Sequence, residues 1–387
     1  MELALRDPLA LHLEIGEPDA YAPSHAVEAA AAACRAGLTG YTSSQGMPEL
    51  REVVAAHVAA TTGRACAPDD VVITHGAMNG LSLAMGALLS PGEEVLLPDP
   101  EFPNWRMAAM IAGARVGSYP TSAAAGFVPD PDVVEAAITP ATRALLICSP
   151  NNPTGAVYPP EVLEALVEVA TRHDLWVLSD ECYDAITFDS PHVSPRTFDV
   201  DGRVLVFRSM SKTYAMTGWR LGYAAVPDPA AAELMAHLAE GTVACASTVS
   251  QHAALAAMTG PQDEVAVAVR SYRDRRDAAT ELLGRRGVTC VRPAGAFYLM
   301  VDVEDEDTDA FALRLLERRH VAVAPGSTFG PGAAGMVRVA LAAERGELLD
   351  GLTRLADQIE EDRAARLASG AVPAGDWSPQ PTGVAPS

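Results

Sequence analysis

The sequence almost lacks lysine: among its 28 lysines and arginines, Lys212 is the only lysine. This bias indicates that arginine has replaced lysine wherever only a positive charge is needed. A lysine that remains then marks a place where arginine would fail, because an amine can lose its proton near neutral pH and form an imine with a carbonyl. The alternative is a surface lysine left by chance, and the residues around it decide between the two.

Positive charge is also scarce in total, with 50 acidic residues and a formal net charge of −22. A surface this acidic disfavours binding to nucleic acid and to anionic membranes. Any anionic ligand must therefore be gathered by local positive groups, so an arginine at a predicted pocket is informative. The sequence also lacks an apolar run of the roughly 18 residues that a membrane span needs.

The six cysteines are widely spaced and show no C-x-x-C pairing. We expect free thiols in a reducing compartment, and neither a disulfide framework nor a metal site. The N-terminus carries an early acid and lacks the basic-then-apolar pattern of a secretion signal. These features together predict a cytoplasmic protein.

From residue 71 onward, short apolar runs alternate with helical stretches. This alternation is typical of an α/β fold with a mostly parallel sheet covered by helices on both faces. Two long helices are expected to follow it, at about 229–258 and 262–286. The predicted strands are 71–74, 94–97, 115–119, 143–148, 175–179, 204–207 and 221–226, and the helices between them are 79–89, 104–112, 131–138 and 160–173.

A smaller α+β domain is expected from the C-terminal part of the chain, with the N-terminal segment packed against it. Its predicted strands are 289–291, 297–303, 321–324 and 336–341, and its last helix is 344–368. The predicted organisation is an N-terminal arm and part of the small domain over 1–45, a large domain over 46–286, a small C-terminal domain over 287–368, and a disordered tail rich in proline and glycine over 369–387.

Several motifs lie at the ends of predicted strands, where ligands bind in sheets of this kind. After strand 71–74, backbone N–H groups near Ala77 and Met78 suit a phosphate, although a tight turn is the better interpretation of this segment alone. Phe102 follows the next strand and is either a ring-stacking residue or part of the core. Asn152 lies in Ser-Pro-Asn-Asn-Pro-Thr-Gly, a stiff loop that can aim an amide.

Strand 175–179 is followed by Asp180 and, three residues later, by Tyr183. A carboxylate at the end of a buried strand is costly unless it meets a cation. Asp180 therefore needs a partner such as a protonated pyridine nitrogen, or else a structural ion pair with an arginine. The Tyr183 hydroxyl is close enough in sequence to reach the same ligand.

Ser209, Lys212 and Arg220 combine a hydroxyl, an imine-forming amine and a fixed cation, which a phosphorylated aldehyde requires. With these motifs in order, the chain resembles the class I/II aminotransferase family of fold-type I pyridoxal-phosphate enzymes. The resemblance covers roughly residues 10–365. It rests on the ordered set N-P-T-G, D-x-x-Y, S-x-S-K, G-x-R-x-G and a late arginine, Arg338, in Met-Val-Arg-Val-Ala.

The resemblance implies an enzyme of amino acid metabolism that moves an amino group from an L-amino acid to a 2-oxo acid. Lys212 would hold pyridoxal 5′-phosphate as a Schiff base and shuttle a proton. Asp180 would keep the pyridine nitrogen protonated, so that the ring accepts electrons. Phe102 would stack on the ring, while Asn152 and Tyr183 would hydrogen-bond its phenolic oxygen.

The resemblance also implies how anionic groups are held and how subunits assemble. Arg338 would clamp the substrate α-carboxylate, helped by Asn152 and the backbone of Gly16; the alternative for Arg338 is a surface salt bridge. The protein would be a homodimer with shared active sites. The phosphate would be held by the backbone of Ala77 and Met78, by Ser209 and Arg220, and by Tyr41 reaching across from the other subunit.

Substrate and reaction type stay open at this point. Dicarboxylate-specific relatives carry an extra arginine in the segment that corresponds to residues 241–251, which has no cation here. A neutral or small substrate side chain, or an arginine from elsewhere, therefore remains possible. A lyase or an oxidative deaminase on the same scaffold is the alternative enzyme. A non-catalytic regulatory protein is disfavoured, because every cofactor-contacting residue is kept.

Overall fold

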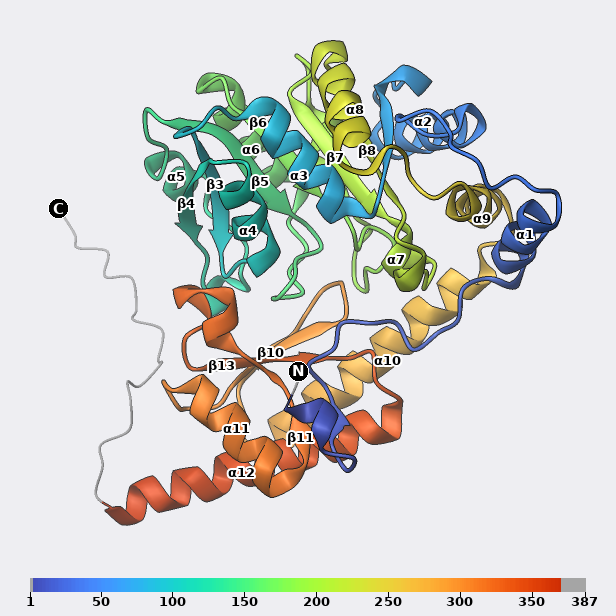
Figure 1. Ribbon diagram of the computed structural model, residues 1–387. Coiled ribbons are helices and arrows are strands. Elements are labelled where there is room, and N and C mark those ends of the chain that lie inside the picture. Colours follow the sequence, from blue (N-terminus) through green and yellow to red (C-terminus); the bar gives the residue numbers. More distant parts are fainter. Residues whose placement is uncertain (1–2, 370–387) are drawn as a thin grey trace.

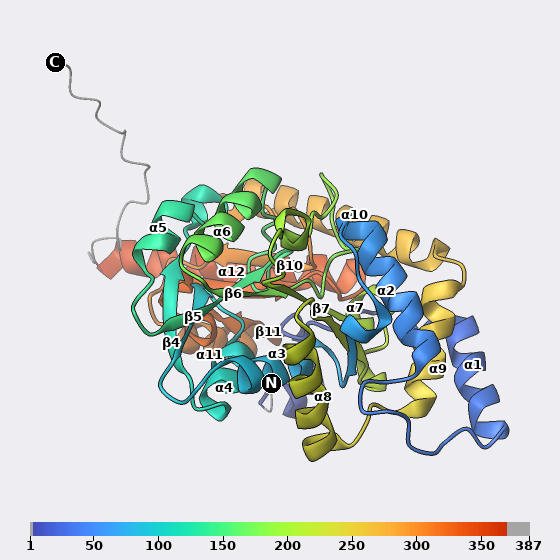
Figure 2. The same ribbon diagram turned by 90° about the horizontal axis from the view of Figure 1, so that it is seen from above.

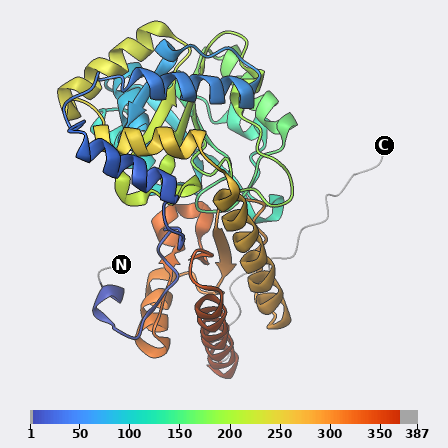
Figure 3. The ribbon, with the colours of Figure 1, turned by 90° about the vertical axis from the view of Figure 1, so that its right-hand side faces the viewer.

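A computed structural model of the protein describes residues 3–369. Figure 1 shows two lobes, with a large sheet in the upper one and smaller sheets in the lower one. The side view in Figure 3 shows the same division, with the N-terminal segment running down to the lower lobe. The long helix α10 (Asp263–Arg285) extends between the two lobes.

The large sheet consists of seven strands: β2 (Val71–Thr74), β3 (Glu94–Asp99), β4 (Arg115–Pro120), β5 (Thr142–Cys148), β6 (Trp176–Asp180), β7 (Val204–Ser209) and β8 (Gly222–Ala225). Their order is β2-β8-β7-β6-β5-β3-β4. Pairing is parallel from β7 across to β4, whereas β8 runs antiparallel to both β2 and β7. The predicted mostly parallel sheet is therefore confirmed.

Helices cover both faces of this sheet, because its central strands are apolar on both sides. The first face carries α3 (Ala77–Leu88), α4 (Pro103–Ile111) and α8 (Pro229–Val243), and the second carries α2 (Pro48–Thr62), α5 (Pro131–Ala136) and α6 (Pro160–Arg172). Figure 2 shows α3 and α8 on one side and α5 and α6 on the other. Successive residues of β5 point to opposite faces. Leu146 packs in the hydrophobic core under the first set of helices, whereas Leu145 and Ile147 pack in the core under the second set.

The lower lobe contains a four-stranded sheet of β9 (Cys290–Val291), β10 (Tyr298–Asp302), β12 (Ala324–Pro325) and β13 (Met336–Ala340). It also contains the parallel pair of β1 (Leu11–His12) and β11 (Val321–Ala322), so the N-terminal segment packs where it was expected. Helices α11 (Thr308–Arg319) and α12 (Arg345–Ser369) complete this lobe.

The domain boundaries at residues 45, 286 and 368 stay a prediction. The tail predicted for 369–387 lies outside the described residues, except for Ser369, which ends α12. Within residues 3–369, no helix combines the length and the apolar character that a membrane span requires.

Two predicted elements are wrong in extent. The helix expected over 229–258 is two helices, α8 and α9 (Thr248–Thr259). Ala244 leaves the helical conformation with a φ of 65°, and the Ser247 side chain caps α9 by accepting a hydrogen bond from the Ser250 N–H. The strand expected over 321–324 likewise divides into β11 and β12, which belong to different sheets.

The carboxyl ends of the central strands meet at one edge of the large sheet. Cys148 at the end of β5 pairs with Asp180 at the end of β6, and Asp180 pairs with Phe207 near the end of β7. The short helix α7 (Met210–Thr213), which carries Lys212, follows β7 directly. In Figure 1, α7 lies at the edge of the upper lobe that faces the lower one.

Candidate active site

A cavity of about 310 Å³ lies at these strand ends. Ligands bind at this position in sheets of this kind. Every predicted site residue except Tyr41 lines the cavity, so the fold brings together residues as distant in sequence as Gly16 and Arg338. The walls come from the N-terminal arm, the start of α3, the loops after β3, β5 and β6, the α7 region and β13.

The N-terminus of α3 and the side chain of Arg220 border one end of the cavity. Gly76 precedes α3 with a φ of 78°, and a Cβ there would lie only 3.1 Å from Arg220 Nη2, so the backbone and the guanidinium approach closely. The N–H groups of Ala77 and Met78 lie in the first helical turn, where the helix itself offers no acceptor. With the hydroxyl of Ser209 beside them, these donors suit a phosphate.

Asp180 is buried at the end of β6. Its carboxylate accepts hydrogen bonds from Trp105 Nε1 at 3.0 Å and from the Cys182 N–H at 3.2 Å. Within residues 3–369 it forms no ion pair, so the arginine partner considered above is not found. Burial raises the pKa of Asp180, because these neutral donors offset only part of the lost hydration. A protonated ring nitrogen would supply the missing positive charge, and in this respect the cavity fits pyridoxal phosphate.

Lys212 enters the same cavity from α7. Its Nζ donates a 2.6 Å hydrogen bond to the carbonyl oxygen of Gly16 in the N-terminal arm. The ring centroid of Phe297 lies 5.7 Å from Nζ on the lower-lobe side. Because the chain has no other lysine, an aldehyde that enters this cavity meets a single side-chain amine.

Arg338, on β13, is 8% exposed and lies between two aromatic rings. The centroids of Tyr298 and Phe329 are 4.3 and 4.8 Å from its Cζ. Nη1 donates to Asn152 Oδ1 and Nη2 to the carbonyl oxygen of Glu14, both at 2.8 Å, while Nε has no partner among the described residues. The guanidinium is thus fixed by neutral groups and keeps its charge for a ligand carboxylate. The surface salt bridge considered as the alternative is not formed within residues 3–369.

Two tyrosine hydroxyls meet in the cavity wall. Those of Tyr183 and Tyr298 are hydrogen-bonded at 2.9 Å. Burial raises the pKa of Tyr183 well above its usual value, so its hydroxyl stays protonated and can donate to a ligand oxygen.

Among the lining residues that were not identified from the sequence, Trp105 and Tyr298 contact predicted site residues directly. Trp105 is fully buried, donates to Asp180 and packs edge-to-face on Phe102, with ring centroids 5.8 Å apart. A buried indole needs an acceptor for its N–H, and this signal was available. Tyr298 covers Arg338 and bonds Tyr183, but no local pattern marks it, because both partners are distant in sequence.

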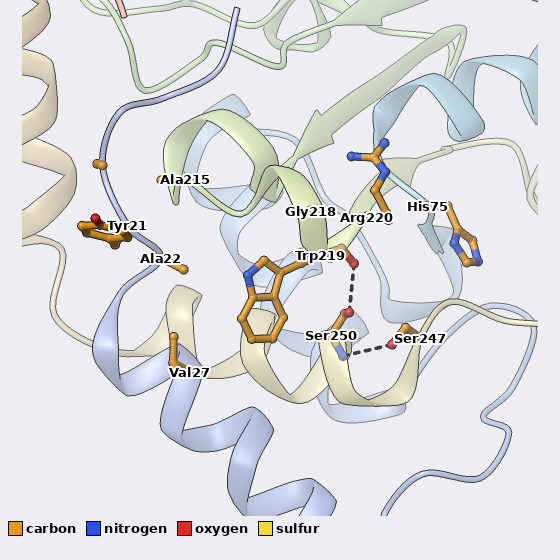
Figure 4. A pocket seen from close by; sticks show the side chains of 11 residues that line it. Tyr21, Ala22, Val27, His75, Ala215, Gly218, Trp219, Arg220, Ser247 and Ser250 are labelled. Atoms are coloured by element: carbon orange, nitrogen blue, oxygen red, sulfur yellow. Dashed lines mark hydrogen bonds between the residues drawn. The ribbon is translucent and has the colours of Figure 1, made fainter. Parts of the chain in front are cut away.

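Tyr41 does not line the cavity, and its side chain is 90% exposed. A second, more open hollow of about 710 Å³ lies on the outer side of Arg220. Figure 4 shows Tyr21 and Trp219 around this hollow, with Arg220 and His75 on its other side. Arg220 therefore borders both cavities, and the hollow lies next to the end of the inner cavity that suits a phosphate.

The chain is similar to known proteins over most of its length. A family model described as aminotransferase class I and II matches residues 10–355. The chain is 40% identical to aspartate/prephenate aminotransferase of Thermus thermophilus, over 89% of each chain. It matches the solved structure of Thermus thermophilus aspartate aminotransferase with maleate at a TM-score of 0.87 and 39% identity, covering 90% of this chain and 91% of that one. It also matches the solved structure of aromatic aminotransferase from Pyrococcus horikoshii, at a TM-score of 0.89 and 34% identity. That match covers 93% of this chain and 98% of that one.

Proposed function

The chain belongs to the class I and II aminotransferase family and is an aminotransferase, and from this premise we propose that the cavity around Lys212 is its active site. Membership of the family implies pyridoxal 5′-phosphate as the cofactor. One observation carries the proposal: the only lysine of the chain shares a cavity with Asp180 and Arg338. Among the described residues, the buried Asp180 carboxylate has no cation and the fixed Arg338 guanidinium has no carboxylate.

When bound, pyridoxal phosphate supplies an aldehyde that reacts with amines and a ring that accepts an electron pair. The donors at its phosphate end are the N–H groups of Ala77 and Met78, the Ser209 hydroxyl and Arg220. Phe102 would pack against a flat face of the ring, and its own ring is held by an edge-to-face contact with Trp105. These residues would hold the cofactor beside Lys212, which lines the same cavity.

Asp180 holds a proton on the ring nitrogen, because that positive charge compensates its own buried negative charge. Asn152 and Tyr183 hydrogen-bond the phenolic oxygen. Lys212 would hold the cofactor through Nζ, and its amine would take up and return the proton of the substrate Cα. The Gly16 carbonyl, already 2.6 Å from Nζ, positions this amine.

Arg338 binds the α-carboxylate of the substrate through charge-assisted hydrogen bonds. Its stacking between two rings and its bonds to Asn152 and Glu14 fix the guanidinium before the substrate arrives. An L-amino acid and a 2-oxo acid both carry this carboxylate. One clamp therefore serves both halves of a ping-pong reaction.

The proposal includes a homodimer with shared active sites. The exposure of Tyr41 and the open hollow beside Arg220 in Figure 4 support it, because a second copy can bring its own Tyr41 to the phosphate end there. We also assign the enzyme to the cytoplasm, which agrees with six cysteines that are all unpaired.

Replacing Lys212 tests the proposal. We expect Lys212→Ala to abolish both amino transfer and the visible absorbance of the bound cofactor. Arg285→Ala, which removes an exposed cation at the end of α10 that does not line the cavity, should leave both unchanged. Normal amino transfer by Lys212→Ala would remove this residue from the active site.

Product analysis separates amino transfer from the reactions that the sequence left open. We expect a new amino acid to accumulate in step with loss of the donor when a 2-oxo acid is present. Release of free ammonia in its place would indicate a lyase or an oxidative deaminase.

A further inference from the structure

The cations around the inner cavity are only as many as the cofactor and one substrate carboxylate require. Within residues 3–369, those that line it are Lys212, Arg220 and Arg338. In the proposed function, Lys212 carries the cofactor, Arg220 binds the phosphate, and Arg338 binds the α-carboxylate. Within this chain, none of the three is left for a second carboxylate on the substrate side chain. Residues 241–251, where dicarboxylate-specific relatives carry an extra arginine, have no cation, so a second copy brings none from this segment.

Arginines near the arm and the α4 region are already engaged. Arg106 donates to both carboxylate oxygens of Glu101, through Nε at 2.5 Å and Nη2 at 3.0 Å. Arg275 donates to Asp19 at 2.5 Å and also to two backbone carbonyl oxygens. Turning either side chain toward the cavity would break these charge-assisted bonds. His75 faces the outer hollow instead, with Nε2 3.2 Å from the Cys245 carbonyl oxygen.

Apart from the Asp180 carboxylate, the rest of the wall is uncharged, and a second acid lies next to it. Glu17 directly follows Gly16, and its carboxylate accepts a hydrogen bond from the Thr217 hydroxyl. Both Gly16 and Thr217 line the cavity, so this negative charge lies beside the entrance. The uncharged side chains of the remaining wall include those of Met78, Phe102, Asn104, Trp105 and Tyr298.

We propose that the substrates are amino acids and 2-oxo acids with uncharged side chains, and that aspartate, glutamate and their 2-oxo acids react poorly. This inference rests on the proposed function and narrows its substrate class. A second carboxylate would lose its water without gaining a cation, which disfavours its binding. The restriction applies to both half-reactions, because the amino acid and the 2-oxo acid use the same cavity in turn.

Substrates matched in size test this directly. Asparagine and aspartate have side chains of nearly equal shape that differ in one charge, and so do glutamine and glutamate. Leucine has an apolar side chain of similar size. With the holoenzyme, we expect kcat/KM for leucine to exceed that for aspartate by at least about tenfold, and asparagine to react faster than aspartate. Aspartate reacting as fast as leucine or faster would overturn the inference.

Binding of unreactive acids provides a second readout that does not depend on turnover. Maleate carries two carboxylates and 3-phenylpropionate carries one, and calorimetry on the holoenzyme gives Kd for each. We expect 3-phenylpropionate to bind at least about tenfold more tightly. If maleate binds more tightly while amino acids are still converted, the substrate inference fails and the proposed function stands. If no amino acid is converted and neither acid binds, the proposed function fails, and the substrate inference fails with it.

A variant tests whether charge is the cause. Asn104→Arg adds a cation to the wall and should tighten maleate binding at least about tenfold. Asn104→Gln lengthens the same side chain without charge and should leave Kd for maleate within about twofold of the wild-type value. If the folded Asn104→Arg protein binds maleate no better than Asn104→Gln does, missing charge is not what excludes dicarboxylates, and the inference is wrong.

Discussion

Asp180 and Glu181 are adjacent carboxylates, both buried, that lie on opposite faces of the large sheet. Within the described part of the chain, Asp180 has only neutral donors, the Trp105 indole and the Cys182 N–H. Glu181 has a full set of charged and polar partners: Arg208 at 2.8 Å, His192 Nε2 at 3.0 Å, and the hydroxyls of Ser179 and Ser194. The same strand end thus carries one carboxylate paired for stability and one left without a cation.

The two carboxylates respond to burial in opposite ways. Burial raises the pKa of Asp180. For Glu181, burial alone would raise the pKa, but the charge of Arg208 and the hydrogen bond from His192 hold it well below its ordinary value. Cations are therefore available at this strand end. Among the described residues, the lack of a cation at Asp180 is therefore a local feature of the cavity. In the proposed function, a cofactor with a protonated ring nitrogen would supply this charge.

Removing the charge of Asp180 should have the largest effect on catalysis. We expect Asp180→Asn to lower kcat by about 10²–10⁴-fold, because the ring nitrogen loses the group that holds its proton. The free energy of unfolding of the cofactor-free protein should stay equal or rise, since a buried charge without a cation is removed. A kcat within about threefold of the wild-type value would show that the two carboxylates do not differ in function.

Removing the charge of Glu181 should have the reverse outcome. Glu181→Gln leaves Arg208 with one acidic partner, Asp184 at 3.0 Å, and we expect the free energy of unfolding to fall by about 3 kcal/mol. The kcat of the folded variant should remain within about threefold. Denaturant unfolding and steady-state kinetics measure both quantities.

An exposed ion pair provides the control for Glu181→Gln. Glu281→Gln breaks the pair with Arg285 on the surface of α10 and should cost less than about 0.5 kcal/mol. If Glu181→Gln is as mild as this control, the buried cluster does not stabilise the fold as described.

Loss of the indole donor should have an intermediate effect on the Asp180 side. Trp105→Phe keeps the ring packing on Phe102 but removes the hydrogen bond to the carboxylate, so we expect kcat to fall and the Kd for pyridoxal phosphate to rise, each by about tenfold. Trp105→His keeps a ring N–H and should restore part of the loss. Equal defects in the two variants would indicate a packing role alone.

The smallest effect should appear in the pH dependence of stability. The folded protein holds Glu181 ionised, so its contribution is present above its ordinary pKa of 4.5 and is lost as the pH falls toward the lower folded value. Asp180 has the opposite effect, because its pKa is raised in the folded protein. In the cofactor-free protein, its contribution lowers the stability as the pH rises from its ordinary pKa of 3.8 toward its higher pKa in the folded state.

Acid unfolding curves of the cofactor-free single variants measure this difference. Relative to the wild type, Glu181→Gln should show a shallower loss of stability on acidification and Asp180→Asn a steeper one. Changes of the same sign in both variants would contradict the assigned pKa directions.

The strands and the main site residues were predictable because their signals are local. Apolar runs such as 143–148 need no partner to be recognised, and the ordered motifs around Asn152, Asp180 and Lys212 each lie within a few residues. The break between α8 and α9 was not predictable in the same way. An alanine-rich sequence without proline favours a continuous helix, and only the conformation of Ala244 and the Ser247 cap interrupt it.

Contacts between distant segments account for what the sequence did not show. Nothing in the sequence near Asp180 indicates that Trp105 donates a hydrogen bond to it. Trp105 lies 75 residues earlier in the chain, and strands β4 and β5 come between them. The opposite environments of Asp180 and Glu181 likewise depend on which helices cover each face. Side-chain alternation predicts that they point apart, but the sheet order decides that Glu181 meets Arg208.

The site of cofactor attachment tests the central claim most directly. The holoenzyme is reduced with borohydride, digested and analysed by mass spectrometry; Lys212 is the only lysine, so the assignment has no side-chain ambiguity. The account predicts a pyridoxyl-phosphate adduct on the peptide that contains Lys212 and none in Lys212→Ala. A reduced protein that had been active but carries no adduct on this peptide would contradict it.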